Sequence, residues 1–334
     1  LEQILKESPE HIDSLLKMGS IKSHAREYSA AFNYYKRAYS IDPSRPETLF
    51  ALADVKEASG AYPDALVYVD EILEMYEDNV RALYRKRELL EKMEKWDDIV
   101  YLQRKIIKMK KSDKGRAREQ EKLLGYKYEQ GRYSLENGEF EKAQKTFQTV
   151  LRLDKKFIPA HLGLAEVMLR EGNADDAVNY LENGYLQTRS LIVLARIEDM
   201  LINLDEPGRL ISIYRTALLK EPDSVPLKLM LGKLYHRLEM LDDALEVLQS
   251  IDYSGTGSPE IAKILGNIYL KRHEPQKAAQ QFKKAIDMRR AFRVPYCCAI
   301  CGFFAVDWAG RCPSCKNWNT YQFDISDSCR IALV

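Results

Sequence analysis

The chain has 334 residues, of which 46% are hydrophobic and 30% charged, and its 51 Lys and Arg almost balance its 50 Asp and Glu. This is the composition of a globular protein, and its near-zero net charge gives no general case for binding nucleic acid or an acidic membrane. No apolar run approaches the ~18 residues of a membrane span, and no signal peptide opens the chain. Because the chain begins at Leu1 rather than Met, directly in helix-like sequence, we expect it to be a fragment.

A period of 34 residues runs through the chain to about residue 290. Small residues open the second half of most units at this spacing, with one wider step of 44 between Ile99 and Ala143, and a second series stands twelve residues earlier. Antiparallel helices cross closely only where side chains are small, so the pattern predicts stacked helix pairs. The first series is Ala31, Ala65, Ile99, Ala143, Ala177, Leu210, Ala244 and Ala278, and the second is Gly19, Ala53, Arg87, Gly131, Ala165, Glu198, Gly232 and Gly266.

A larger residue, such as Tyr35, Phe147 or Phe282, follows each small position of the second helix by four, and we expect it to fill the layer between the helices. The segment Leu231-Gly232-x-x-Tyr235…Ala244…Leu248 resembles the tetratricopeptide repeat. The resemblance implies an all-α fold, a right-handed solenoid of about eight helix pairs over residues 1–290. Such a solenoid presents a long face that binds protein segments and has no natural active-site pocket.

The wide step carries a run of basic residues. One interpretation is a docking patch for phosphate or an acidic partner, and the other is a solvated linker balanced by Glu119 and Glu121. We expect the second, with ten extra residues that lengthen either the connection or the next first helix. The basic residues are Arg104, Lys105, Lys108, Lys110, Lys111, Lys114, Arg116 and Arg118.

Two Cys-x-x-Cys pairs, Cys298/Cys301 and Cys312/Cys315, stand ten residues apart near the end of the chain. Four thiolates at this spacing can converge on one metal ion, because a tight turn aims the two sulfurs of each pair at a common point. A pair of disulfides is the alternative, but cysteines this localised do not form a secreted disulfide framework. We predict one Zn or Fe ion in a four-cysteine site, and the residues alone do not separate the two metals.

The turn of each pair favours a residue with positive φ after the second Cys. Gly302 provides it in the first pair, whereas Lys316 stands at the equivalent place in the second. Cys297 and Cys329 are expected to be spare thiols, which is typical of a reducing compartment.

Residues 291–325 are predicted to form the small metal-binding ribbon, followed by a tail at 326–334. So short a segment buries little surface, so we expect the ion and an aromatic mini-core to hold it together and to cover the open edge of the repeats, either on the last repeat or further into the concave face. Four closed thiolates leave no position for substrate, and no catalytic motif occurs elsewhere, so we expect no enzyme activity and no small-molecule substrate. The aromatic residues are Tyr296, Phe303, Phe304, Trp308, Trp318, Tyr321 and Phe323.

The ribbon by itself, from Cys298 to Trp318-Asn319-Thr320, is similar to the zinc ribbon of RadA-type DNA repair ATPases, although the ATP-binding core is absent. This likeness, with Arg289, Arg290 and Arg293 just before the ribbon, leaves a nucleic-acid-binding protein as the alternative function. An iron electron-transfer protein is a third possibility, because rubredoxin has similar cysteine pairs.

Tetratricopeptide repeats that run directly into Pro295-Tyr296-x-Cys298-x-x-Cys301-Gly302 and Cys312-Pro313-Ser314-Cys315-x-x-Trp318 resemble the lipopolysaccharide assembly protein B family over essentially the whole chain. The resemblance implies that the four cysteines are metal ligands of a rubredoxin-type domain. It also implies a non-catalytic adaptor on the cytoplasmic face of the inner membrane, with an anchor upstream of Leu1. The implied partners are the UDP-acyl-GlcNAc deacetylase of lipid A synthesis and a membrane-bound AAA protease that degrades it, and no nucleic acid is expected.

Overall fold

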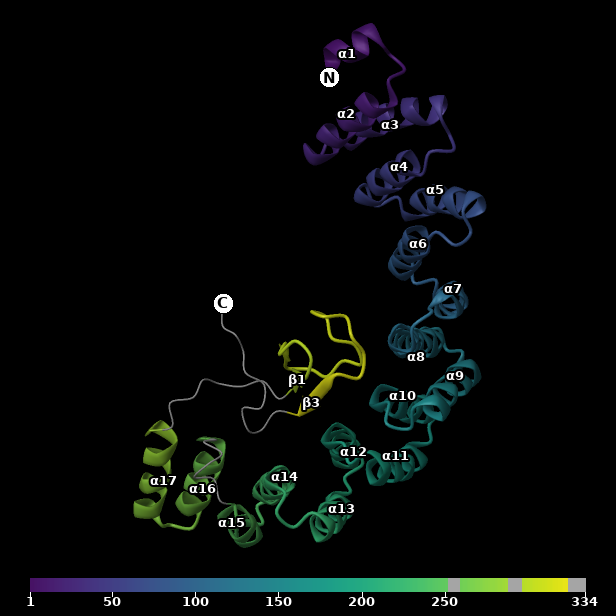
Figure 1. Cartoon of the computed structure of the whole chain (residues 1–334). Coiled ribbons are helices and arrows are strands. Elements are labelled where there is room, and N and C mark those ends of the chain that lie inside the picture. Colours follow the sequence, from purple (N-terminus) through teal and green to yellow (C-terminus); the bar gives the residue numbers. More distant parts are fainter. Residues whose placement is uncertain (252–258, 288–295, 324–334) are drawn as a thin grey trace. The chain divides into compact units, whose positions relative to one another are not determined.

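The computed structural model describes residues 1–251, 259–287 and 296–323, which form seventeen helices and three short strands (Figure 1). Among the described helices, none combines the length and apolar character needed to cross a bilayer. The elements are α1 (Glu2–Glu7), α2 (Ile12–His24), α3 (Tyr28–Ile41), α4 (Pro46–Ala58), α5 (Tyr62–Met75), α6 (Val80–Lys92), α7 (Trp96–Met109), α8 (Asp113–Glu136), α9 (Phe140–Leu153), α10 (Ile158–Arg170), α11 (Ala174–Thr188), α12 (Leu191–Asn203), α13 (Pro207–Lys220), α14 (Val225–Arg237), α15 (Leu241–Gln249), α16 (Pro259–Lys271), α17 (Pro275–Asp287), β1 (Tyr296–Cys298), β2 (Phe304–Ala305) and β3 (Tyr321–Phe323).

The described helices from α2 to α17 form eight pairs, and each first helix ends at a residue with left-handed backbone. Gly60 takes this conformation with φ 79°, and the residue after it donates its backbone N–H to the carbonyl of Lys56. This bond closes the helix end and turns the chain into the second helix. Gly138 and Gly172 act in the same way, and five non-glycine residues adopt the conformation at the equivalent place: Arg26, Glu94, Asp205, Glu239 and His273.

The chain divides into two compact units, Leu1–Gln130 and Gly131–Val334. The boundary falls within α8, which has 24 residues where α10 has 13. The insertion expected from the 44-residue step therefore lengthens a first helix.

The predicted small and large positions meet inside the helix pairs. A Cβ atom added to Gly232 would lie 2.5 Å from a side-chain carbon of Leu248, sixteen residues later. Such a distance is shorter than real contacts allow, so the crossing requires glycine there. The same spacing relates Gly19 to Tyr35, Gly131 to Phe147 and Gly266 to Phe282.

Two first helices carry a long polar residue at the position that is small elsewhere. The Arg87 guanidinium donates a hydrogen bond to Gln103 Oε1 at 3.0 Å, and the Glu198 carboxylate accepts one from the Tyr214 hydroxyl. Both partners again stand sixteen residues later. A hydrogen-bonded polar pair therefore replaces the small-large pair in these two layers, which satisfies groups that would be costly to bury alone.

The three strands form one antiparallel sheet in the order β2-β1-β3. Tyr296 pairs with Ala305 on one side and with Phe323 on the other. The predicted boundaries of the ribbon at 291 and 325 and the tail at 326–334 lie outside the described residues and stay predictions.

Candidate metal centre

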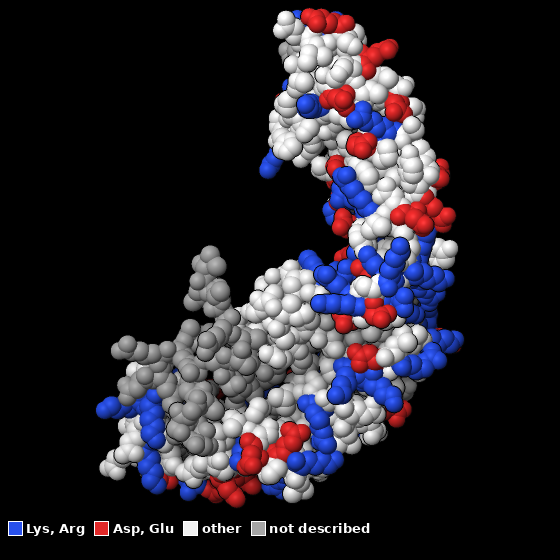
Figure 2. Space-filling model, viewed as in Figure 1, with Lys and Arg blue, Asp and Glu red and all other residues white. Residues whose placement is uncertain are grey.

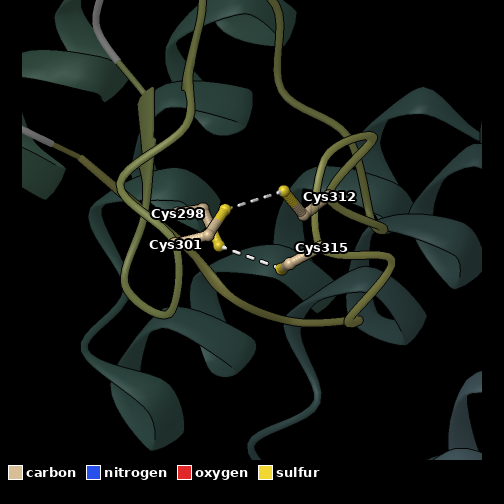
Figure 3. A group of neighbouring side chains, drawn as sticks. All are labelled: Cys298, Cys301, Cys312 and Cys315. Atoms are coloured by element: carbon tan, nitrogen blue, oxygen red, sulfur yellow. Dashed lines mark hydrogen bonds between the residues drawn. The ribbon is translucent and has the colours of Figure 1, made fainter. Parts of the chain in front are cut away.

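The four cysteines of the two Cys-x-x-Cys pairs come together in space. Their Sγ atoms all lie within 4.8 Å of one another, on two turns that face each other (Figure 3). Cys298 Sγ is 3.7 Å from Cys315 Sγ, and Cys301 Sγ is 3.6 Å from Cys312 Sγ. A tetrahedral ion with metal–sulfur bonds of about 2.3 Å places its sulfurs about 3.8 Å apart. The cluster therefore has the spacing and the donor atoms to hold one metal ion.

The two turns have the same backbone geometry. Gly302 donates its N–H to the carbonyl of Cys298 at 2.9 Å, and Lys316 donates to the carbonyl of Cys312 at 3.0 Å. Both residues have positive φ, 72° and 60°. Lys316 thus adopts the conformation that glycine provides in the first turn, and its departure from the pattern does not change the local fold.

The pKa values of two of the thiols are shifted in opposite directions. Burial acts to raise the pKa of Cys298, but hydrogen bonds from Thr320 and from the backbone of Cys301 and Ile300 outweigh it and lower that pKa to about 6. Burial raises the pKa of the Cys312 thiol to about 12, and the neighbouring Cys301 and Cys315 add to the effect. Negative charge on several crowded sulfurs is unfavourable without a cation, so the site favours a metal ion over four free thiolates.

The ribbon packs against helices that precede it by more than a hundred residues. Cys298, Cys312 and Tyr321 belong to one buried cluster with residues of α10 to α16, and β3 lies beside α12 (Figure 1). The side-chain amide of Asn319 bonds the backbone of the connection between α9 and α10. The ribbon therefore contacts α12, well before the final pair, which favours the second of the two expected placements, further into the repeats rather than on the last repeat alone.

The sequence missed two residues of this site. Thr320 Oγ1 lies 3.2 Å from Cys298 Sγ, and Asn319 joins the ribbon to the repeats. Asn319 has a φ of 53°, which asparagine tolerates better than most residues. The pair Asn319-Thr320 after the last Trp was therefore a signal for a tight turn, but its partners were not visible in the sequence.

Two other expectations are corrected or left open. Cys297 is buried and engaged in a disulfide bond, so the prediction of a spare thiol is wrong for this residue. Cys329 and the arginines at 289, 290 and 293 lie outside the described residues.

The comparisons with known proteins concern the repeats. The profile of the tetratricopeptide repeat family matches residues 23–90 and 134–189. The TPR repeat-containing protein YpiA of Bacillus subtilis is 22% identical over 290 residues, which are 85% of this chain and 66% of that protein. The chain thus spans just under two thirds of this relative's length.

Solved structures with similar folds include a tetratricopeptide repeat protein from Parabacteroides merdae and the structure of Naa15/Naa10 bound to HypK-THB. The first is 16% identical with a TM-score of 0.33, over 84% of this chain and 93% of that chain. The second is 16% identical with a TM-score of 0.45, over 86% of this chain and 49% of that chain. With the family match and the eight helix pairs, the helical part of this chain is a tetratricopeptide-repeat solenoid, and a small strand region with four clustered cysteines follows it.

Proposed function

We propose that the chain is a non-catalytic adaptor whose four cysteines, Cys298, Cys301, Cys312 and Cys315, hold one structural zinc or iron ion. The repeats make it a protein-interaction scaffold, because paired helices present extended surfaces for protein segments. The ion, when bound, cross-links the two turns of the ribbon, and the chain's own aromatic and backbone contacts hold the ribbon on the repeats. Four thiolates complete the tetrahedral coordination of the ion, so no coordination position remains for a substrate.

The proposed pathway is regulation of lipopolysaccharide synthesis. The adaptor would bring the UDP-acyl-GlcNAc deacetylase of lipid A synthesis to a membrane-bound AAA protease, at the cytoplasmic face of the inner membrane. The observation that carries this proposal is the four-cysteine ribbon packed into the core of the repeats. Joined in this order, repeats and ribbon resemble the lipopolysaccharide assembly protein B family.

Degradation in a purified system tests the proposal. The deacetylase and the membrane protease are combined in detergent with and without this chain, and the lifetime of the deacetylase is followed. We expect the chain to bind both proteins and to shorten the lifetime. A second substrate of the same protease, degraded at an unchanged rate, controls for general activation. If the chain binds neither protein, or binds both without changing the lifetime, the adaptor proposal is wrong.

A further inference from the structure

One surface of the first unit carries much more positive charge than the rest of the chain. Residues 104–118 contain eight Lys and Arg and one acid, Asp113, whereas the whole chain has a net charge of only +1. The segment comprises the second half of α7, the connection at 110–112 and the first turns of α8. Figure 2 shows blue side chains gathered over α7 and α8. We call five of these residues the α7–α8 basic face: Arg104, Lys108, Lys111, Lys114 and Arg118.

All five residues of the basic face are exposed and have no ion-pair partner within the described part of the chain. Their neighbours differ. Lys105 pairs with Glu77 at 2.6 Å, Arg116 lies 3.7 Å from Asp113, and Lys110 lies over the Tyr84 ring at 5.0 Å. The charge that remains is therefore concentrated on the five members of the face.

One of the two acids expected to balance this charge, Glu119, is turned into the core. Glu119 is 5% exposed and accepts hydrogen bonds from Arg87 at 2.8 Å and from Gln103 at 2.8 Å. Burial acts to raise the pKa of Glu119, but the Gln103 hydrogen bond, Lys122 and Arg87 outweigh it and hold that pKa below its ordinary value. Glu119 is thus ionised and neutralised internally. The interpretation of residues 104–118 as a linker balanced by Glu119 and Glu121 is wrong in two respects, because Glu119 pairs with Arg87 in the interior and residues 113–118 are helical.

An exposed aromatic ring adjoins the basic face. Tyr101 is 77% exposed and precedes Arg104 by one turn of α7 and Lys108 by two. Tyrosine prefers the boundary between water and an apolar phase, where its ring is buried and its hydroxyl is hydrated. Lysine ammonium groups match a dense layer of phosphates without needing a fixed fork geometry.

We propose that the α7–α8 basic face binds the surface of an anionic phospholipid bilayer, with Tyr101 at the headgroup level. Clusters of four to eight cations on a helix suit such a surface. Single-stranded nucleic acid instead calls for several exposed aromatic rings along a basic groove, and Tyr101 is the only exposed aromatic side chain within residues 96–120, all of which the structure describes. A cavity of about 840 Å³ lies between first helices of the same unit, lined by residues that include Phe50 and Arg81. That cavity, rather than the basic face, has the form that suits a protein segment. The inference does not depend on the adaptor function.

Vesicle flotation with the full chain tests the proposal. The probes are vesicles of phosphatidylcholine alone and vesicles in which about one third is phosphatidylglycerol. We expect binding to the anionic vesicles only, and a steep loss of binding as salt is raised. A triple variant, K108Q/K111Q/K114Q, should bind about a hundredfold more weakly, since each cation near the surface contributes about fivefold. Tyr101→Ser should weaken binding by a smaller factor and leave the salt dependence unchanged.

The matched control removes three lysines that already have partners. The variant K145Q/K271Q/K277Q changes the net charge equally, but these lysines pair with Glu141, Glu239 and Glu274. It should bind anionic vesicles as tightly as the parent chain does. Circular dichroism is used to check that both triple variants are folded. Equal binding to both vesicle types, or equal losses in the two triple variants, overturns the proposal. The proposal is also overturned if a single-stranded RNA competes more strongly than the vesicles for the chain and the K108Q/K111Q/K114Q variant no longer binds that RNA.

Discussion

The side-chain oxygen of Asn319 accepts a hydrogen bond from the backbone N–H of Ile158 at 3.2 Å, across 161 positions of the sequence. The nitrogen of the same amide donates to the carbonyl of Lys156, also at 3.2 Å. One side chain of the ribbon thus satisfies two backbone groups in the connection that leads into α10. These two hydrogen bonds to the main chain fix where the ribbon lies on the repeats, and they do not depend on the side chains at positions 156 and 158.

Asn319→Ala should loosen the ribbon from the repeats without emptying the metal site. The substitution removes two hydrogen bonds, so we expect the free energy of unfolding to fall by about 1–3 kcal/mol. Hydrogen exchange at residues 156–158 should become faster while metal content stays unchanged. The control is Asn183→Ala, because Asn183 is exposed and bonds only within its own helix. Unchanged exchange at 156–158 would contradict the docking role of Asn319.

Replacing Cys312 and Cys315 by Ser should abolish metal binding and unfold the ribbon, because a segment this short lacks a sufficient core of its own. Elemental analysis reports the metal, and a red shift of Trp308 and Trp318 fluorescence reports unfolding. Ser314→Ala in the same turn is the control, since Ser314 is exposed and belongs to no sulfur cluster. A double variant that keeps one ion and unchanged fluorescence would show that these cysteines are not the ligands.

Gly232→Ala should destabilise the solenoid although alanine is the better helix former. The new methyl group would lie 2.5 Å from Leu248, and overpacking of this kind costs about 1–3 kcal/mol against a gain of about 1 kcal/mol from helix propensity. Gly208→Ala is the matched control, because no atom lies within 4 Å of its added Cβ. Urea unfolding compares the two. If both variants gain stability equally, the close crossing of α14 and α15 is not real.

Glu198→Gln should raise stability at neutral pH. Burial raises the pKa of Glu198 above its ordinary value, although the Tyr214 hydrogen bond opposes the shift. The contribution of Glu198 is therefore fully present below about pH 4.3, the ordinary value, and is lost as pH rises through the higher pKa of the folded state. Glutamine keeps an acceptor for Tyr214 without the charge. We expect a higher urea midpoint at pH 7 and a flatter pH profile.

Urea midpoints measured from about pH 4 to about pH 8 check this prediction, because the window opens at the ordinary carboxyl pKa of about 4.3. Tyr214→Phe is the companion variant, because it removes the donor and leaves the buried carboxylate without its partner. It should lose stability most at neutral pH. Parallel pH profiles for the parent and Glu198→Gln would mean that Glu198 does not titrate in this range.

Much of the fold was predictable because its constraints are short in sequence. A typical helix pair spans 34 residues, and in four of the pairs a glycine lies close to a large side chain sixteen residues later, as Gly232 and Leu248 illustrate. Because a larger side chain would clash at that contact, glycine or alanine recurs there, and this recurrence is visible in the sequence. The four cysteines were readable for the same reason, since a tight turn brings each Cys-x-x-Cys pair to one point.

What only the tertiary structure decided involves residues far apart in the chain. Arg87 stands at a position that is small in most other repeats. Arg87 and Gln103 hydrogen-bond to Glu119 and hold it in the interior, so Glu119 does not neutralise the α7–α8 basic face. The place where Asn319 meets the connection before α10 follows from how the two surfaces fit, not from any local pattern. A repeat records the contacts made within it, whereas contacts between distant segments depend on shapes that exist only once the chain has folded.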